Sequence, residues 1–309
     1  MLAIVGPTAS GKSLLAMRVA ERLPIEIVSC DSQQVYAGMD IGTAKPSLAD
    51  RRSVPHHLLD VVVPTETFHA ARWANLARVA IQHILARGRV PVVVGGTGLY
   101  LRALLWGLFD APPSDPAIRE RHKDEARVLG VEALHARLAS IDPHTAVQVQ
   151  PRDLLRISRA LEIYEQTGIP ISALRMRQSA PGTVSAAVLI LDPPLEVLRQ
   201  RIGPRFDAMI ASGLLDEVRI LRARFGRDAR ALQALGYRQV GEHLDGLLTL
   251  EEAVAVAKAA TSAYARRQRT WFRKDRDAWR AEVPPSPAQL IDWWRSLPEV
   301  VPTPEPRLI

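Results

Sequence analysis

Cysteine is almost absent from this 309-residue sequence, with Cys30 as its single representative. One cysteine excludes an intrachain disulfide and a cysteine-rich zinc site, and it fits the reducing cytoplasm. Long apolar runs are also lacking. The most apolar window, residues 90–109, contains Pro91, four glycines and Arg102, so it does not match a transmembrane helix. No secretory signal pattern is visible at the N-terminus. We therefore expect a soluble, cytoplasmic protein without a membrane segment.

Aromatic residues are scarce, at 5%, but apolar residues make up 47% and charged residues 24% of the chain. These fractions are typical of soluble globular proteins and exclude a disordered or collagen-like chain. The length suggests about two domains. The formal charge of +7 is concentrated, because residues 264–280 contain seven Arg or Lys against two Asp. Clustered positive charge favours a polyanionic partner, although a solvated helix face would have the same composition.

Short apolar runs alternate with helical patterns over most of the chain. Four runs have strand length: residues 2–5, 25–30, 90–94 and 188–191. Parallel strands covered on both faces by crossover helices produce this alternation, so we expect an α/β fold with a doubly wound parallel sheet. From Glu196 onward only helical patterns appear.

A polar, helical stretch without any strand-like run interrupts the alternation. It covers residues 112–179 and is bounded by proline-rich turn signals. We expect a helical insert over 112–179, and a catalytic core with C-terminal helices made of residues 1–111 and 180–309.

A glycine-rich loop follows the first expected strand. It matches the pattern G-x-x-x-x-G-K-[ST] in full and consists of Gly6, Pro7, Thr8, Ala9, Ser10, Gly11, Lys12 and Ser13. In such loops the backbone N–H groups and the helix N-terminus surround phosphate oxygens. The loop predicts a P-loop NTPase-like core that binds a di- or triphosphate, with Lys12 on the outer phosphate and Ser13 as a ligand of Mg²⁺. It does not distinguish phosphoryl transfer from departure of diphosphate.

Asp31 directly follows the second expected strand. Ligands of open α/β sheets bind outside the carboxyl ends of the strands, so this carboxylate is expected in the binding crevice. P-loop enzymes commonly carry an acidic metal ligand after an apolar strand, but the run at 92–94 ends in Gly-Gly-Thr. Asp31 is therefore a candidate metal ligand or general base, with helix capping as the alternative.

Five further segments are much more specific than the glycine loop. They read CDSQQVY at 30–36, DIGTAKP at 40–46, GGTGLY at 95–100, ALGYRQ at 234–239 and RRQRTWFRKD at 266–275. Together with the loop they resemble the bacterial tRNA dimethylallyltransferase family, in the family's order and over nearly the whole chain. Adenylate isopentenyltransferases share the loop and the Asp-Ser motif and remain the nearest alternative.

The resemblance implies transfer of a dimethylallyl group from dimethylallyl diphosphate to N6 of the adenosine that is 3′-adjacent to the anticodon in tRNAs reading UNN codons. The glycine loop then holds the diphosphate leaving group, and the adenine is flipped into a pocket. Asp31 matches the family's general base, and Thr97 matches a catalytic-pocket residue. Arg201 and Arg205 are predicted to close over the diphosphate, with Arg205 as a catalytic residue. The implied cofactor is Mg²⁺, the implied partners are the tRNA anticodon stem-loop and the prenyl donor, and we expect a monomer.

The resemblance also implies a set of tRNA-binding residues. They are Asp31, Ser32, Gln33, Gln34, Thr97, Arg119, Leu155, Arg156, Ile157, Ser158, Arg159, Gln233, Gly236, Tyr237, Arg238 and Gln239. Independently of the resemblance, the spacing of Arg152, Arg156 and Arg159 predicts one helical face suited to phosphate contact, or to plain solvation.

Three aromatic residues, Trp271, Phe272 and Trp279, interleave with the basic segment. Such rings can stack on bases, but we expect core anchors here. The pair His56-His57 is assigned no metal, because adjacent residues on a strand point to opposite faces. Two other functions fit the glycine loop alone: a P-loop small-molecule kinase and a non-catalytic, nucleotide-dependent RNA-binding module.

Overall fold

The computed structural model describes residues 1–109, 111–177, 184–275 and 277–298. These residues fold into two compact units, each with its own hydrophobic core. The first unit contains Met1–Gly107 and the described residues from 184 onward, and the second begins at Leu108 and extends through the helices that end at Arg177. The expected helical insert, residues 112–179, overlaps the second unit. The expected turn at Pro181-Gly182 lies outside the described residues.

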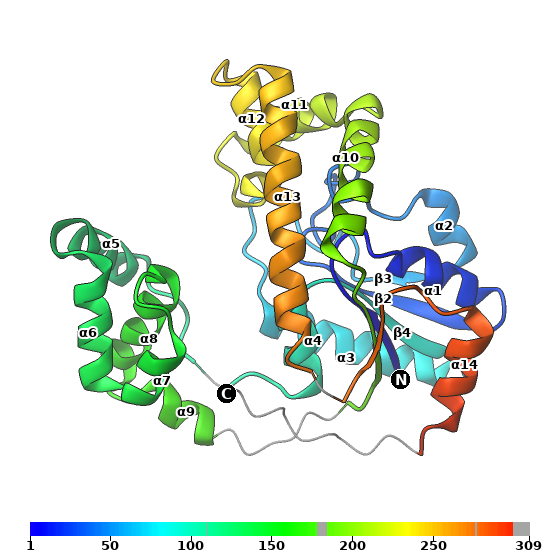
Figure 1. Ribbon diagram of the computed structural model, residues 1–309, viewed down its shortest axis with the longest axis horizontal. Coiled ribbons are helices and arrows are strands. Elements are labelled where there is room, and N and C mark those ends of the chain that lie inside the picture. Colours follow the sequence, from blue (N-terminus) through cyan, green and yellow to red (C-terminus); the bar gives the residue numbers. More distant parts are fainter. Residues whose placement is uncertain (110, 178–183, 276, 299–309) are drawn as a thin grey trace. The chain divides into compact units, whose positions relative to one another are not determined.

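A six-stranded, all-parallel sheet forms the centre of the first unit (Figure 1). Its spatial order is β3-β2-β4-β1-β5-β6. The strands are β1 (Leu2–Val5), β2 (Ile25–Cys30), β3 (His56–His57), β4 (Val90–Gly95), β5 (Ala187–Leu191) and β6 (Trp279–Ala281). The predicted α/β class with a P-loop-like parallel core is confirmed.

The four apolar runs in the sequence form the four inner strands. Side chains such as Ile4, Val92 and Leu189 have no exposed surface, because helices cover the sheet. The expectation that only helices follow Glu196 is wrong, since β6 pairs with β5 at the edge of the sheet. This strand has three partly exposed residues and therefore carries no apolar run for sequence analysis to detect.

Helices of the first unit pack around the sheet and extend from its carboxyl end. They are α1 (Lys12–Ala20), α2 (Leu48–Ser53), α3 (Ala70–Ala86), α4 (Gly98–Leu105), α10 (Leu195–Ala211), α11 (Leu214–Phe225), α12 (Tyr237–Leu244), α13 (Leu250–Phe272) and α14 (Pro287–Ser296). The long helix α13 begins with a capping box between Thr249 and Glu252 and lies alongside α10 (Figure 1). Helix α10 continues through Pro204 without a break.

The described residues of the second unit form helices only. They are α5 (Pro116–Leu129), α6 (Val131–Ile141), α7 (Pro143–Gln148), α8 (Leu154–Thr167) and α9 (Ile171–Arg177). Buried side chains of α6 and α8, among them Leu134, Leu138 and Leu161, form its core. Throughout the described part of the chain, every helix is too short or too polar to span a membrane.

Candidate active site

A cavity of about 770 Å³ opens in the first unit where β1, β2 and β4 end. The glycine loop, the segment that begins at Asp31 and the end of β4 line one part of it. Residues 42–44, residues 233–235 and side chains of α10, α12 and α13 line other parts. Residues from distant parts of the sequence, including Lys12, Asp31, Arg205 and Tyr237, therefore meet around one space.

The glycine loop between β1 and α1 depends on its glycines. Gly6 has a φ of 146°, and a Cβ built on it would lie 2.2 Å from the carbonyl oxygen of Leu191. Gly11 has a φ of 95° and directly precedes α1. These two positions let the chain turn from the buried strand into the helix, so that the helix N-terminus and the loop N–H groups face the cavity side of the sheet.

Lys12 is the cation at the base of the loop. In this structure its Nζ donates to the Pro7 carbonyl at 2.5 Å and to Ser10 Oγ at 3.3 Å. Burial of the ammonium group and the nearby charge of Arg205 lower the pKa of Lys12 to about 7, against an opposing effect of Asp31. Lys12 is therefore poised between its charged and neutral forms near neutral pH.

Two arginines of α10 contact the same loop. Arg205 Nη1 donates to Thr8 Oγ1 at 3.3 Å, and Arg201 Nη1 donates to the Ala9 carbonyl at 3.2 Å. Burial lowers the pKa of Arg205, and the charge of Asp31 opposes that shift. The structure thus brings three cations to one loop, an arrangement suited to a ligand with several negative charges.

Asp31 lies at the end of β2, half-buried on the cavity wall. Its Oδ1 accepts hydrogen bonds from the backbone N–H groups of Gln33 at 2.8 Å and Gln34 at 3.3 Å. Thr97 Oγ1 accepts from the Ser32 N–H at 3.0 Å, which joins this turn to the GGTGLY segment. With Oδ1 held by backbone amides, the orientation of the carboxylate is fixed before any ligand binds.

Gln268 is a site residue that the sequence analysis missed. This side chain is buried, its Oε1 accepts from the Thr8 N–H at 2.9 Å, and its Nε2 donates to the Gly96 carbonyl at 2.8 Å. It therefore ties the glycine loop to the GGTGLY segment. Gln268 lies inside the RRQRTWFRKD motif, so the motif could have identified it as a site residue. The basic residues on both sides of it favoured an interpretation in terms of charge alone.

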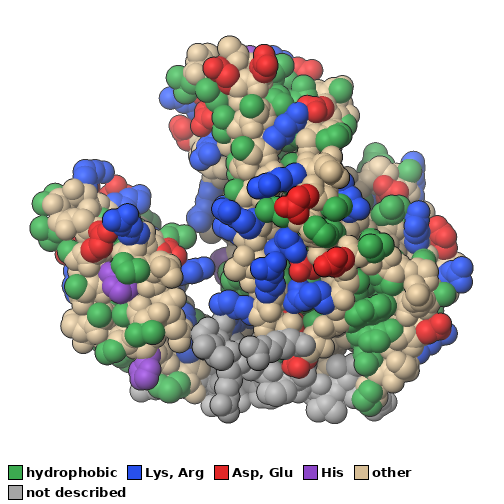
Figure 2. All heavy atoms as spheres, in the orientation of Figure 1, with side chains coloured by type: hydrophobic (Ala, Val, Ile, Leu, Met, Phe, Trp, Pro, Cys, Tyr) green, Lys and Arg blue, Asp and Glu red, His purple; other side chains and the backbone are tan. Residues whose placement is uncertain are grey.

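Helix α13 also supplies Thr261, Tyr264 and Arg267 to the cavity wall, and α10 supplies Phe206 and Met209. The sequence analysis predicted none of these five as site residues. Burial raises the pKa of Tyr264 to about 12, so its phenol remains protonated and can donate a hydrogen bond near neutral pH. Lys and Arg side chains gather around α13 on the face of the first unit that Figure 2 shows. In the C-terminal part of α13 and directly after it, Arg266, Arg267, Arg273 and Lys274 are exposed.

The three aromatic residues of the basic segment have different environments. Phe272 is buried, and Trp279 packs against the core and against Trp293, with ring centroids 4.9 Å apart. Both are anchors, as expected. Trp271 is 39% exposed and lies over Gly98, where a Cβ would come within 2.1 Å of the indole. The core-anchor expectation is therefore wrong for Trp271, which covers the GGTGLY segment.

The predicted tRNA-binding residues near α12 differ in exposure. Gln233 and Tyr237 line the cavity, and Arg238 is exposed. Gln239 is fully buried, and its Oε1 accepts from the Gly236 N–H at 2.9 Å at the start of α12. Gln239 thus supports the helix that carries the exposed positions.

In the second unit, the predicted arginine face differs from the expectation. Arg152 precedes α8, because Asp153 caps that helix, and Arg152 pairs with Glu132 at 2.8 Å. The prediction of one helical face for all three arginines is therefore wrong for Arg152. Arg156 remains an exposed side chain on α8.

The side chain of Glu162 has no exposed surface and binds two of the predicted cations. Arg119 approaches it at 3.2 Å and Arg159 at 2.9 Å. These arginines compensate a buried carboxylate, which reduces the charge that they offer to an external phosphate. Glu162 is a further residue that the sequence analysis missed.

Three other predicted residues of α8, Leu155, Ile157 and Ser158, differ in how much of their surface is exposed. Ile157 and Ser158 are buried, and Ser158 Oγ lies 2.9 Å from His122 Nδ1. Leu155 is 71% exposed. Direct contact of an external ligand with Ile157 is excluded by its burial in the core, and Leu155 and Arg156 are the accessible positions.

The acidic groups near the sheet are engaged by basic side chains. Asp192, which follows β5, accepts from Arg269 at 2.5 Å and from Arg280 at 3.3 Å and so fastens the end of α13 to β6. On β3, His57 pairs with Glu26 at 2.6 Å. In the described ranges no cluster of three His, Cys, Asp or Glu side chains could hold a metal ion.

Comparisons with known proteins agree with these features. A family model described as "IPP transferase" matches residues 34–275. The tRNA dimethylallyltransferase of Anaeromyxobacter sp. (strain K) is 50% identical over 292 residues, which is 94% of this chain and 95% of the relative. The tRNA dimethylallyltransferase of Roseiflexus sp. (strain RS-1) is 50% identical over 277 residues, 89% of this chain and 90% of the relative.

Solved structures give the same result. The full-length tRNA isopentenylpyrophosphate transferase from Bacillus halodurans superposes with a TM-score of 0.68 and 38% identity, covering 95% of this chain and 94% of that chain. A eukaryotic dimethylallyltransferase acting on tRNA superposes with a TM-score of 0.72 and 30% identity, covering 88% of this chain and 69% of that chain.

Proposed function

The chain belongs to the IPP transferase family, and on this premise we propose that it is a tRNA dimethylallyltransferase. It transfers the dimethylallyl group of dimethylallyl diphosphate to N6 of the adenosine next to the anticodon and releases diphosphate. The observation that carries this proposal is the single cavity, which combines a phosphate-binding loop with the oriented carboxylate of Asp31.

The glycine loop serves the leaving group. As the allylic C–O bond breaks, positive charge develops on the carbon and negative charge on the diphosphate. The loop N–H groups, Lys12, Arg201 and Arg205 stabilise that negative charge, and the arginines already contact the loop. Because the diphosphate departs as a unit, the reaction needs no phosphoryl transfer and consumes no ATP.

Asp31 serves the nucleophile. The lone pair of the adenine N6 amine is delocalised into the ring, so the amine attacks poorly unless a base accepts its proton. Asp31 takes that proton as the N6–C bond forms, which contributes roughly 10²–10⁴-fold to the rate. The cavity has room for a base, and Phe206 and Tyr264 on its wall provide aromatic surface for an adenine flipped out of the anticodon loop.

Magnesium is part of the proposal. The Ser13 hydroxyl is exposed at the start of α1 and lines the cavity, which fits the role of a single protein ligand to Mg²⁺. The ion supplies further neutralisation of the leaving diphosphate when bound. The predicted tRNA contacts at Ser32, Gln33, Gln34 and Thr97 are retained, because these residues lie beside Asp31.

We further propose that the protein acts on tRNA in the cytoplasm. In this proposal the protein acts as a monomer. The macromolecular substrate is a cytoplasmic tRNA, and exposed Arg and Lys side chains around α13 suit its phosphates. None of the relatives described above is an adenylate isopentenyltransferase or a small-molecule kinase, so these alternatives have no support.

The experiment incubates the protein with unmodified tRNA, Mg²⁺ and dimethylallyl diphosphate labelled in the prenyl group, with and without ATP. We expect label in the tRNA, recovered as an N6-substituted adenosine after digestion, at the same rate in both reactions. Absence of incorporation together with ATP hydrolysis would favour the kinase or the nucleotide-dependent binding module. A third reaction replaces the tRNA with adenosine monophosphate, and incorporation of label there but not into tRNA would favour the adenylate enzyme.

A further inference from the structure

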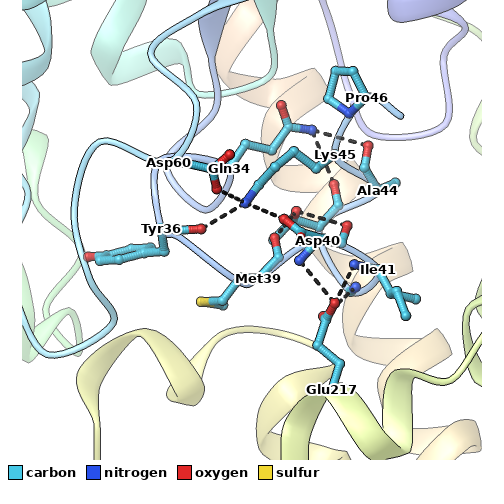
Figure 3. A network of polar contacts seen from close by, with 12 residues as sticks. Gln34, Tyr36, Met39, Asp40, Ile41, Ala44, Lys45, Pro46, Asp60 and Glu217 are labelled. Carbon is cyan, nitrogen blue, oxygen red and sulfur yellow. Dashed lines mark hydrogen bonds and ion pairs between the residues drawn. The ribbon is translucent and has the colours of Figure 1, made fainter. Parts of the chain in front are cut away.

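Glu217 lies on α11 outside the cavity wall, yet its carboxylate accepts hydrogen bonds from four groups of two cavity-lining segments. Three are consecutive backbone amides. Oε2 accepts from the Ile41 N–H at 2.7 Å and from the Asp40 N–H at 3.1 Å, and Oε1 accepts from the Gly42 N–H at 3.2 Å. Figure 3 shows the carboxylate pointing from α11 at this loop. Successive N–H groups of this kind form a concave site for an anion, and here the anion is a side chain.

The fourth donor is Tyr237 on α12. Its hydroxyl donates to Glu217 Oε1 at 2.6 Å, and its ring lies so close to Gly42 that a Cβ there would come within 2.5 Å of it. Tyr237 is 1% exposed, and burial beside Glu217 raises the pKa of its phenol, so it remains a donor. The carboxylate therefore joins the loop at 40–42 to α12.

The same loop positions a residue next to Asp31. Gln34 Nε2 donates to the carbonyls of Thr43 at 3.2 Å and Ala44 at 3.3 Å, and Gln34 Oε1 accepts from Ser29 Oγ at 3.0 Å. At its other end the loop is held by Lys45, whose buried ammonium group forms ion pairs with Asp40 and Asp60 (Figure 3). The contacts of Glu217 and those of Lys45 together determine the position of Gln34 and residues 42–44 in the cavity wall.

We propose that Glu217 is a positioning residue for the substrate base: through the loop at 40–44 and Tyr237 it sets the wall of the cavity against which the flipped adenine is recognised. This inference rests on the proposed function. It assigns Glu217 no contact with the RNA or with the diphosphate. The glycine loop is held separately, by Gln268 and by the arginines of α10, so its phosphate affinity is independent of Glu217.

The experiment compares Glu217→Ala and Tyr237→Phe with the wild type and with Asp216→Ala. Asp216 neighbours Glu217 on the same helix, is exposed and pairs with Arg219, so it is a matched control. Two anticodon stem-loops are used, one with adenosine next to the anticodon and one abasic at that position. Fluorescence anisotropy gives the Kd for each RNA, and calorimetry with inorganic diphosphate and Mg²⁺ gives the Kd for the loop ligand.

For Glu217→Ala we expect the preference for the adenosine RNA over the abasic RNA to fall about tenfold. Tyr237→Phe, which removes one donor of four, lowers it by about threefold. The Kd for diphosphate stays within about twofold of the wild type in both. Asp216→Ala leaves both the preference for the adenosine RNA and the Kd for diphosphate unchanged. If Glu217→Ala does not fold, as judged by circular dichroism, Glu217→Gln, which keeps the size of the side chain and removes its charge, is measured in its place.

An unchanged preference in the folded variants would overturn the proposal and leave Glu217 as a structural residue. A parallel loss of diphosphate affinity would overturn it as well, because the effect would then be general. Failure of the proposed function is distinguishable, since it appears in the wild type as absence of prenyl incorporation or of any preference for the adenosine RNA.

Discussion

Diphosphate binding should depend on the ionisation of Lys12. Burial and the charge of Arg205 lower the pKa of Lys12 to about 7 in the free protein. A bound diphosphate stabilises the ammonium form, so the pKa of Lys12 rises on binding and the protein takes up a proton. The contribution of Lys12 to affinity is therefore highest below pH 7 and decreases as the pH rises, because neutral Lys12 must first be protonated.

The magnitude follows from the same pKa. The protonated fraction of Lys12 falls from about 0.9 at pH 6 to about 0.1 at pH 8, so the contribution of Lys12 to affinity should decrease about tenfold over this interval. At pH 8 binding should be accompanied by uptake of roughly 0.9 proton by Lys12. Isothermal titration calorimetry with inorganic diphosphate, in two buffers of different ionisation enthalpy, measures both quantities.

Lys12→Arg is the matched control, because a guanidinium remains charged over the whole interval. Inorganic diphosphate titrates in the same range, and its own protons contribute equally to both proteins. The difference between wild type and variant therefore isolates Lys12. Equal proton uptake by the two proteins would refute the assignment of Lys12 as the titrating ligand of the diphosphate.

Three further results are expected. Asp31→Asn should lower turnover by roughly 10²–10⁴-fold in a single-turnover assay while the Kd for tRNA stays within a few-fold, and unchanged turnover would remove the base assignment. Gly96→Ala should weaken diphosphate binding in calorimetry, because a Cβ would lie 2.3 Å from Gln268 Nε2 and displace the side chain that holds Thr8; an unaltered Kd would contradict this link. Glu26→Gln should lower Tm at pH 7, since hydrogen bonds from Arg87 and His57 hold the pKa of Glu26 below its ordinary value. That loss should shrink in melts as the pH falls from 4.5, the ordinary pKa of a glutamate, through the lowered pKa of Glu26, because the wild-type carboxylate then becomes protonated as well.

The inner strands and the glycine loop could be predicted because their signals are local. A fully buried parallel strand is a continuous apolar run, and the loop is eight consecutive residues with a steric requirement for glycine. The edge strand β6 lacks such a run, because only one side of it is paired and its residues are partly exposed. Sequence patterns of this length therefore recover the centre of the sheet and miss its edge.

The residues that hold the site together could not be predicted in the same way. Gln268 meets Thr8 across 260 residues of sequence, and Glu217 meets Ile41 across 176. Neither the spacing of residues nor the composition of the chain indicates these two contacts. In the second unit, spacing predicted an accessible face that includes Arg159, and the resemblance implied a tRNA contact for Arg119. The structure shows instead that Glu162, a buried carboxylate, engages both arginines. Charge can be counted from sequence, whereas its compensation depends on tertiary contacts.

The most direct test of the account follows both products of one turnover. Enzyme in excess over tRNA is mixed with Mg²⁺ and a donor labelled separately in its prenyl and diphosphate groups, without ATP, and diphosphate release and N6-prenylated adenosine are quantified in the same samples. We expect equal amounts of the two products, formed at one rate in the wild type and slowed together in Asp31→Asn. Release of diphosphate without alkylated adenosine, or a requirement for ATP, would contradict it.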